Sequence, residues 1–250
     1  MSFTSVSEAL NESFIQSVNA SNRCMNEHAK MHLLYGVGRR LQIIRRNFCS
    51  ISSITDKDRK APVDDEEQVE LNLHINSLYL HIKGLMDNLA WAVVLELNLY
   101  ADFDATLTKN RRRVGLFNAE FLNQVRNKFP EFYKTLKAKE RWNTDLKSLR
   151  DPIAHRVPIY AVPSFLNKEE AEEYQRKYSQ AINYLNRLDL EEVERLFDEI
   201  KRLGTYVPVF HVAESNEQKL YPVNVQVESD LDNVTVVTLE VIKLFKNKEQ

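Results

Sequence analysis

Apolar residues recur at steps of three and four along most of the chain, the pattern of helices with one buried face. The first such stretch runs from Ser7 to about Ile54. A charged connector over Thr55 to Glu67 separates it from a second stretch, roughly Glu67 to Tyr100, which becomes apolar nearly all round after Leu85. A helix of that kind is buried on every side, so we expect it at the centre of the molecule.

Start and stop signals divide the chain after this helix. Asn118 to Lys128 is predicted to form a helix that ends before Pro130, and a further helix is expected from there to about Leu149. Asn167 can cap a helix to about Leu188, and Asp189 can cap another to Leu203. Most of the second half is therefore expected to be helical as well.

Extended structure is expected in three short segments. Val157 to Phe165 contains two prolines, while Val207 to Val212 and Leu220 to Val227 are β-prone and could pair as a small hairpin. A last helix is expected over Ser229 to Lys246. The predicted fold class is all-α, in a single domain over residues 1–250, with room for a small C-terminal β-hairpin.

Composition excludes several other classes of protein. Five glycines are too few for a turn-dense all-β fold. Cys24 and Cys49 match no disulfide framework or paired zinc spacing, which favours a reducing compartment. No signal peptide is visible, and Glu96 interrupts the apolar run from Leu89 to Leu99 well before the roughly 20 residues that span a bilayer. We expect a cytoplasmic protein without membrane association.

The overall charge is nearly balanced, so binding to a nucleic acid would require a local cluster of basic residues. Lys and Arg total 34 against 36 Asp and Glu, so the overall charge is not that of a typical nucleic-acid binder. The segment Arg111-Arg112-Arg113 is a candidate for such a cluster, although a solvated loop would also carry it. P-loop, GxGxxG, GxSxG and HExxH motifs are absent, and His28 with His32 has no third ligand at a useful spacing. No cofactor and no metal are expected.

The segment Arg150-Asp151-Pro152-Ile153-Ala154-His155 carries the clearest chemistry. Asp151 followed by Pro152 predicts the start of a new short turn. A permanently charged guanidinium and a histidine that titrates near neutrality then lie within one turn, which suits RNA cleavage. The 2′-hydroxyl of RNA is the nucleophile, so the enzyme supplies a base and a cation for the phosphate.

Spacing alone does not decide this interpretation. Arg23 and His28 have the same separation and are interpreted as helix-surface residues that meet it by chance. In the architectural alternative, Arg150 pairs with an acid such as Asp145 or Asp151, and His155 satisfies carbonyls at a helix end.

The surrounding sequence resembles the HEPN superfamily, whose hallmark is Arg, a polar residue, a few more residues and His after a long helix. RDPIAHRVPIY, at Arg150 to Tyr160, and GLMDNLAW, at Gly84 to Trp91, are similar to segments of poorly characterised bacterial HEPN-like proteins. The resemblance covers about residues 31–187 and leaves about 205–250 as a C-terminal extension. It implies a bundle of about four core helices with extra helices, a homodimer and a composite cleft between two copies of the motif.

The resemblance also implies roles for individual residues. His155 would be the general acid/base of a metal-independent endoribonuclease, Arg150 would bind the scissile phosphate, and Asp151 would orient the pair or cap the turn. Pro152 departs from the family pattern and could hold Arg150 away from His155. Further contacts to RNA are expected from Arg156, Arg111, Arg112 and Arg113.

Two questions stay open at the level of sequence. His81, Asp87 and Asn88 lie beside the apolar seam of the second long helix, where they could orient the motif or only join two helices. Many HEPN domains are thought to be non-catalytic. The alternative is therefore a non-catalytic HEPN-like module that binds RNA, a nucleotide or an antitoxin-like protein partner, or a helical scaffold in which the motif is architectural.

Overall fold

The computed structural model describes residues 3–102, 104, 108–212 and 219–246, and its architecture is predominantly helical. A small antiparallel sheet is the other regular element of this part of the chain. The prediction of an all-α class with a small β element is confirmed at this level. In chain order the elements are α1 Phe3–Ser21, α2 Glu27–Met31, the π-helix η1 His32–Gly38, α3 Arg39–Ile54, α4 Asp65–Glu96, α5 Thr108–Arg111, α6 Ala119–Lys128, α7 Pro130–Ala138, α8 Glu140–His155, β1 Tyr160–Ala161, α9 Lys168–Leu185, α10 Leu190–Lys201, β2 Val209–His211, β3 Leu220–Pro222 and α11 Val223–Lys246.

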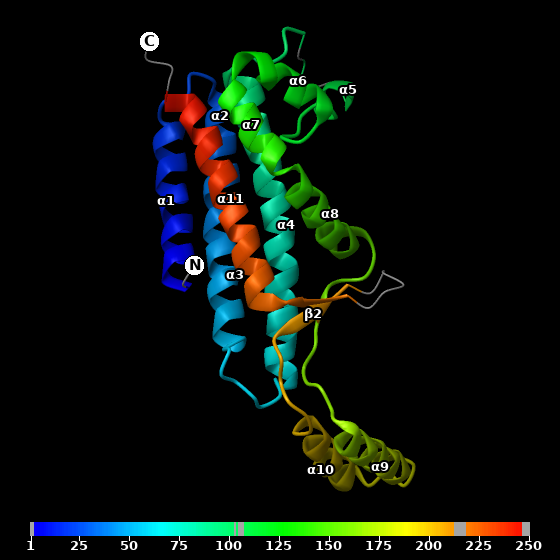
Figure 1. The fold of residues 1–250 in the computed structure, drawn as a ribbon. Coiled ribbons are helices and arrows are strands. Elements are labelled where there is room, and N and C mark those ends of the chain that lie inside the picture. The colour runs from blue at the N-terminus through cyan, green and yellow to red at the C-terminus, as the bar shows by residue number, and fades with distance from the viewer. Residues whose placement is uncertain (1–2, 103, 105–107, 213–218, 247–250) are drawn as a thin grey trace.

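Helix α4 forms the centre of the molecule, as its apolar pattern predicts. In Figure 1, α1, α3, α4 and α11 run side by side as one long bundle, and α8 crosses beside α4. The seam of α4 is fully buried, with no exposed surface on Leu71, Ile75, Leu78, Ile82 and Leu85. Asp64 and Glu67 start this helix with a reciprocal capping box.

The prediction of one unbroken helix from Ser7 to Ile54 is wrong. Helix α1 ends at Ser21, and the chain bends before α2, η1 and α3 follow one another. Asn26 caps the new start by accepting from the backbone N–H groups of His28 and Ala29. The carboxylate of Glu96 accepts the N–H groups of Met25 and Asn26 at 3.1 and 2.9 Å. The bend therefore depends on a buried acid at the end of α4.

Local capping signals predict several of the later helices well. Asn118, Asn167 and Asp189 cap α6, α9 and α10. The helix expected from Pro130 to Leu149 is instead two helices, α7 and α8, which meet at Lys139.

The sheet has three strands in the order β1-β2-β3, all antiparallel. The predicted hairpin corresponds to β2 and β3, and β1 adds a strand from the segment expected to be extended. The expected strand from Leu220 to Val227 is wrong beyond Pro222, because α11 begins at Val223 rather than Ser229. Val223 and Val227 are buried at helical spacing, whereas the intervening Val225 is 70% exposed.

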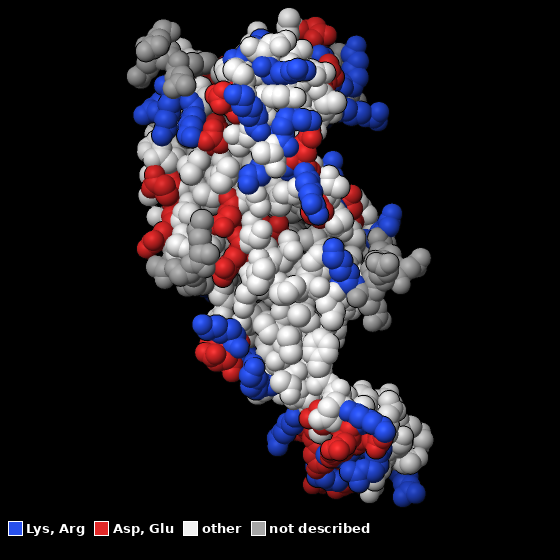
Figure 2. Space-filling view, in the orientation of Figure 1, with Lys and Arg blue, Asp and Glu red and all other residues white. Residues whose placement is uncertain are grey.

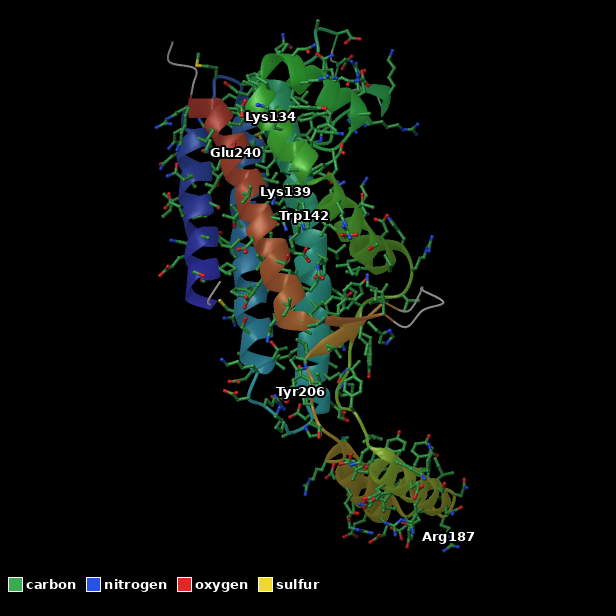
Figure 3. The ribbon with its side chains drawn as sticks, in the orientation of Figure 1. Lys134, Lys139, Trp142, Arg187, Tyr206 and Glu240 are labelled. Atoms are coloured by element: carbon green, nitrogen blue, oxygen red, sulfur yellow. The ribbon has the colours of Figure 1, made fainter. Side chains whose placement is uncertain are left out.

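Helices α9 and α10 form an arm that projects from one end of the bundle (Figure 1). Figure 3 shows Tyr206 near the junction between this arm and the bundle and Arg187 at the far end of the arm. Within the described residues, none of the helices combines the length and apolarity needed to cross a membrane.

Candidate functional site

The Arg–His motif forms the last turn of α8 rather than the start of a new one. Asp151 and Pro152 lie inside the helix, which continues to His155, so the prediction of a new short turn at Asp151 is wrong. Pro152 is buried, while Arg156 follows the helix and donates its backbone N–H to the Pro152 carbonyl at 2.8 Å. The motif therefore extends a rigid element that is packed against the core.

Arg150 and His155 contact each other at this helix end. Their Nη1 and Nε2 atoms are 3.5 Å apart, at the long end of the hydrogen-bond range, so Pro152 does not keep the two side chains apart. Because a guanidinium can only donate, this contact requires a lone pair on the imidazole Nε2. His155 is exposed to solvent.

Asp151 pairs with Arg150 instead of capping a turn. Its Oδ1 is 3.2 Å from the Arg150 Nε, and the side chains of Arg150 and Asp151 are 22% and 57% exposed. The angle at this Nε does not meet hydrogen-bond geometry, so the contact is an ion pair only. The carboxylate therefore lies beside the guanidinium, while the Nη1 atom turns towards His155.

A cavity of about 420 Å³ adjoins the motif on the side of the small sheet. Among the described residues that line it, three carry a cationic side chain and one an acidic side chain. Arg150 and His155 lie outside the lining, and Asp151 belongs both to the cavity and to the ion pair with Arg150. The described residues that line it are Lys147, Ser148, Asp151, Pro152, Arg156, Val212, Lys219 and Tyr221.

Two of these cations, Lys147 and Lys219, are absent from the sequence-based candidates. Lys147 precedes Arg150 by three positions on α8, so helical spacing alone could have identified it. Lys219 directly precedes β3, and only the pairing of β3 with β2 and of β2 with β1 brings it near the motif. Of the arginines expected to contact substrate, Arg156 lines this cavity.

The three polar residues of α4 that could have oriented the motif bond elsewhere. His81 accepts from Arg40 on α3 at 3.1 Å, and Asn88 pairs with the His32 ring at 2.9 Å. Asp87 forms an ion pair with Lys83 on its own helix at 2.7 Å. The hydrogen bonds of His81 and Asn88 thus join α4 to α3 and η1, so these two residues connect helices rather than orient the motif.

The triple-arginine segment lies at a distance from the motif. It begins at Arg111, the last residue of α5, which Figure 1 places at the end of the bundle away from the sheet. Arg113 pairs with Glu120 at 2.7 Å and lies 4.3 Å above the Tyr100 ring, so its charge is already used within the fold. Arg111 and Arg112 are exposed there.

A buried carboxylate on α11 connects α8 to the rest of the bundle. Asp230 on α11 is 2% exposed and accepts from the Tyr79 hydroxyl, the Trp142 indole and the Gln226 amide at 3.0, 2.9 and 3.0 Å. Trp142 reaches it from α8, and Figure 3 shows this residue where α8 passes α11. Burial raises the pKa of the Asp230 carboxyl, and the three donors act in the opposite direction. The cluster ties α4, α8 and α11 together.

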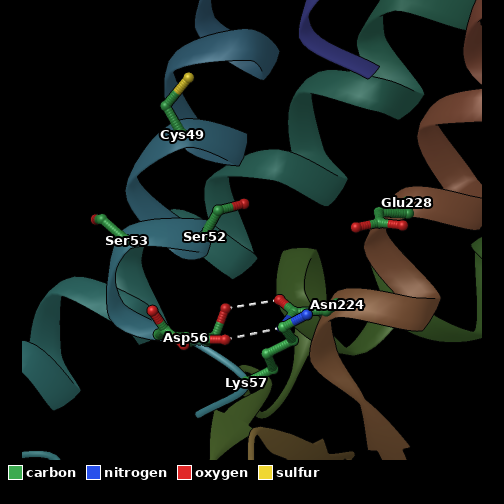
Figure 4. A pocket seen from close by; sticks show the side chains of 8 residues that line it. Cys49, Ser52, Ser53, Asp56, Lys57, Asn224 and Glu228 are labelled. Carbon is green, nitrogen blue, oxygen red and sulfur yellow. Dashed lines mark hydrogen bonds between the residues drawn. The ribbon is translucent and has the colours of Figure 1, made fainter. Parts of the chain in front are cut away.

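A second cavity of about 420 Å³ lies between the end of α3 and the start of α11 (Figure 4). Thr55 and Asn224 close its floor with two hydrogen bonds, of 2.6 and 2.8 Å. Its charged residues are Asp56, Lys57 and Glu228, so it has no excess of cations. Across the described residues, no group of three or more His, Cys, Asp or Glu side chains is arranged to hold a metal ion.

No protein-family model, curated protein or solved structure matches the chain.

Proposed function

We propose that the protein is a cytoplasmic, homodimeric HEPN-like endoribonuclease that cuts RNA without a metal ion. The observation that carries this proposal is the 3.5 Å contact between Arg150 Nη1 and His155 Nε2 at an exposed helix end. The adjoining cavity supports it, because Lys147 and Lys219 are among the described residues that line it, and an RNA backbone requires cations of this kind.

The chemistry follows from the state of these groups. The single lone pair of His155 Nε2 accepts from Arg150 in the free protein, and once the guanidinium turns to the phosphate this lone pair can take the proton of a 2′-hydroxyl. The 2′-oxygen then bonds to the neighbouring phosphorus, and the bond from phosphorus to the 5′-oxygen breaks. Arg150 stabilises the negative charge that builds on the phosphate. The products are a cyclic phosphate and a 5′-hydroxyl.

A second copy of the chain would complete the site. The leaving 5′-oxygen needs a proton while the base holds the one it has taken, and each chain offers one motif histidine. Two exposed helix ends meeting across a two-fold axis would provide a base and an acid on opposite sides of one phosphate. This arrangement is the reason for including the homodimer in the proposal.

The test is cleavage of mixed RNA in EDTA by the wild type, His155→Ala and Arg150→Ala. We expect His155→Ala to slow cleavage by roughly 10² to 10⁴ and Arg150→Ala by roughly 10² to 10³. A DNA strand of the same sequence should not be cut, because it lacks the nucleophile.

Arg23 and His28 provide the matched control. They have the same spacing as the motif and are both exposed, so Arg23→Ala and His28→Ala should cleave like the wild type. Equal cleavage by the wild type and His155→Ala would remove the enzyme proposal. Sedimentation of the same samples measures whether the chain is a dimer.

The second candidate is a non-catalytic HEPN-like module that binds RNA or a nucleotide. The ion pair between Asp151 and Arg150 favours it, because it already satisfies part of the guanidinium. The cations that line the cavity need no catalytic histidine to hold a phosphate. Binding of RNA that neither the wild type nor His155→Ala cleaves would support this candidate.

A further inference from the structure

The arm formed by α9 and α10 has two unlike sides. On one side, Lys177 of α9 lies 3.1 Å from Glu199 of α10 and 2.7 Å from Glu173 of its own helix. On the other side, the Tyr178 ring contacts the Phe197 ring edge-to-face, with centroids 6.1 Å apart. Glu199 and Phe197 are two positions apart, which puts them on opposite sides of α10. Figure 2 shows acidic and basic side chains gathered on the part of the arm that faces the viewer.

The apolar side continues from this ring pair towards the turn between the two helices. Ile182 and Leu185 follow Tyr178 by four and seven positions, so they share its side of α9. Leu190 precedes Phe197 by seven positions and shares its side of α10. The apolar face of the arm consists of Tyr178, Ile182, Leu185, Leu190 and Phe197.

This face exposes enough apolar surface for one half of an interface. Tyr178, Ile182, Leu185 and Leu190 are 41%, 37%, 43% and 63% exposed. At about 200 Å² for each whole side chain, these fractions leave roughly 370 Å² open to solvent. Each partner in a standard interface buries roughly 800 Å², and a little more than half of that area is apolar. The apolar face therefore supplies most of the apolar area that one partner needs.

The arm has little core of its own. Helices α9 and α10 have 18 and 12 residues, and their buried apolar side chains are Ala181, Leu196 and Ile200. Units of fewer than about 40 residues usually need a disulfide, a metal or oligomerisation to stay folded. The arm projects from the bundle (Figure 1), and an ion pair of 2.8 Å between Lys201 and Asp65 of α4 joins its base to the bundle. Covering the apolar face would therefore stabilise the arm.

The residues around this face favour a second copy of the chain as the partner. Gln175, Ser179 and Asn186 are seven, three and four positions from Ile182, so they surround it on the surface of α9. All three are exposed and uncharged. Two such faces can meet without repulsion between like charges, whereas a nucleic acid or a strongly charged peptide would find no opposite charge there.

We propose that the apolar face of the arm is a dimerisation surface, on which the arm of a second copy packs across a two-fold axis. Two arms joined in this way form a four-helix bundle, in which each hairpin completes the core of the other. The inference is independent of RNA cleavage, because it concerns α9 and α10 and none of the residues of the Arg–His motif.

Sedimentation velocity of the full chain over a range of concentrations gives the Kd of dimerisation. Leu185→Asp places a carboxylate within the apolar face, so we expect it to raise this Kd by at least about 30-fold. Ile15→Asp is the matched control, because Ile15 is also 43% exposed but lies on α1. Gln180→Asp adds the same charge to α9 two positions from Ile182, on the opposite side of the helix. Both controls should dimerise like the wild type, and circular dichroism verifies that each variant is folded.

Hydrogen exchange of the wild type tests the same surface without a substitution. Amides of a helix with little core exchange through local opening, and a docked partner suppresses that opening. At a protein concentration about ten times the Kd, exchange in α9 and α10 should be about tenfold slower than in the dilute chain. The amides around the buried seam of α4 should exchange at the same rate at both concentrations.

The inference would be overturned by a wild type that stays monomeric, by an unchanged Kd in Leu185→Asp, or by exchange in the arm that does not depend on concentration. An unchanged Kd would assign the dimer to another face, such as the ends of α8. The two proposals fail separately. A dimer that Leu185→Asp dissociates but that cleaves no RNA removes only the enzyme, whereas cleavage by a dimer that Leu185→Asp leaves intact removes only the arm interface.

Discussion

The contact between η1 and α4 depends on the missing side chain of Gly36. A Cβ atom at this position would lie 2.1 Å from Asn88 Oδ1 and 3.0 Å from Asn88 Cβ. The amide group could rotate away, but the Cβ is fixed to the backbone of α4, so the helix itself must shift. Gly38, two residues later, has the opposite environment, because its added Cβ would meet nothing closer than 3.5 Å.

The two glycines therefore make a matched pair of substitutions. In Gly36→Ala, a displaced Asn88 loses its bonds to His32 and to the Gly84 carbonyl, at about 0.5–1.5 kcal/mol each. Helix propensity returns about 1 kcal/mol, and overpacking costs about 1–3 kcal/mol, so the net loss is about 1–5 kcal/mol. Gly38→Ala keeps only the gain in propensity, about 0.5–1 kcal/mol.

Thermal unfolding followed by circular dichroism measures the difference. For a chain of this length, we expect the Tm of Gly36→Ala to lie about 3–24 °C below that of Gly38→Ala. Removing the obstructing side chain in the double variant Gly36→Ala/Asn88→Ala should recover part of the loss, which a double-mutant cycle quantifies. Equal stability of the two single variants would refute the argument from close approach.

Two other predictions concern buried titratable groups. Burial lowers the pKa of His74 and His81, so the unfolded chain binds protons that the native state does not, and the free energy of unfolding should fall as the pH drops below about 6.5. Urea titrations between about pH 7.5 and about pH 5.5 test this, with a flatter slope expected in His74→Gln/His81→Gln and an equal slope contradicting it. Asp230→Asn turns an amide towards three donors and should lower the free energy of unfolding by about 1–3 kcal/mol in the same titrations. Asp232→Asn, on the same helix, should change the free energy of unfolding by less than about 0.5 kcal/mol, and equal values for the two variants would contradict a stabilising role for the Asp230 cluster.

The elements that sequence predicts well are those fixed by neighbouring residues. Asn118, Asn167 and Asp189 accept backbone N–H groups two or three residues ahead, so the start of each helix is encoded locally. The buried seam of α4 is predicted equally well, because apolar residues at steps of three and four over 32 residues match a helix and no other regular structure.

The errors arise where a distant residue decides the backbone. The bend after α1 is stabilised by Glu96, which is about 70 positions away from the N–H groups it accepts. At the start of α11, the alternation of Val223, Val225 and Val227 suggests a strand. In the structure Val223 and Val227, four residues apart, are buried as on one face of a helix, and Val225 is exposed. Two periodicities compete there, and tertiary burial selects between them.

The candidate site also has a part that local sequence encodes and a part that depends on distant residues. Arg150, Asp151 and His155 are close in sequence, so a single helix end holds all three within about one and a half turns. The cavity beside them requires β3 to pair with β2 and β2 with β1, which spans about 60 residues, so no local signal identifies Lys219. Substitutions on α8 should alter the Arg–His pair directly, whereas binding of the phosphate backbone should also respond to changes in the sheet that leave the motif unchanged.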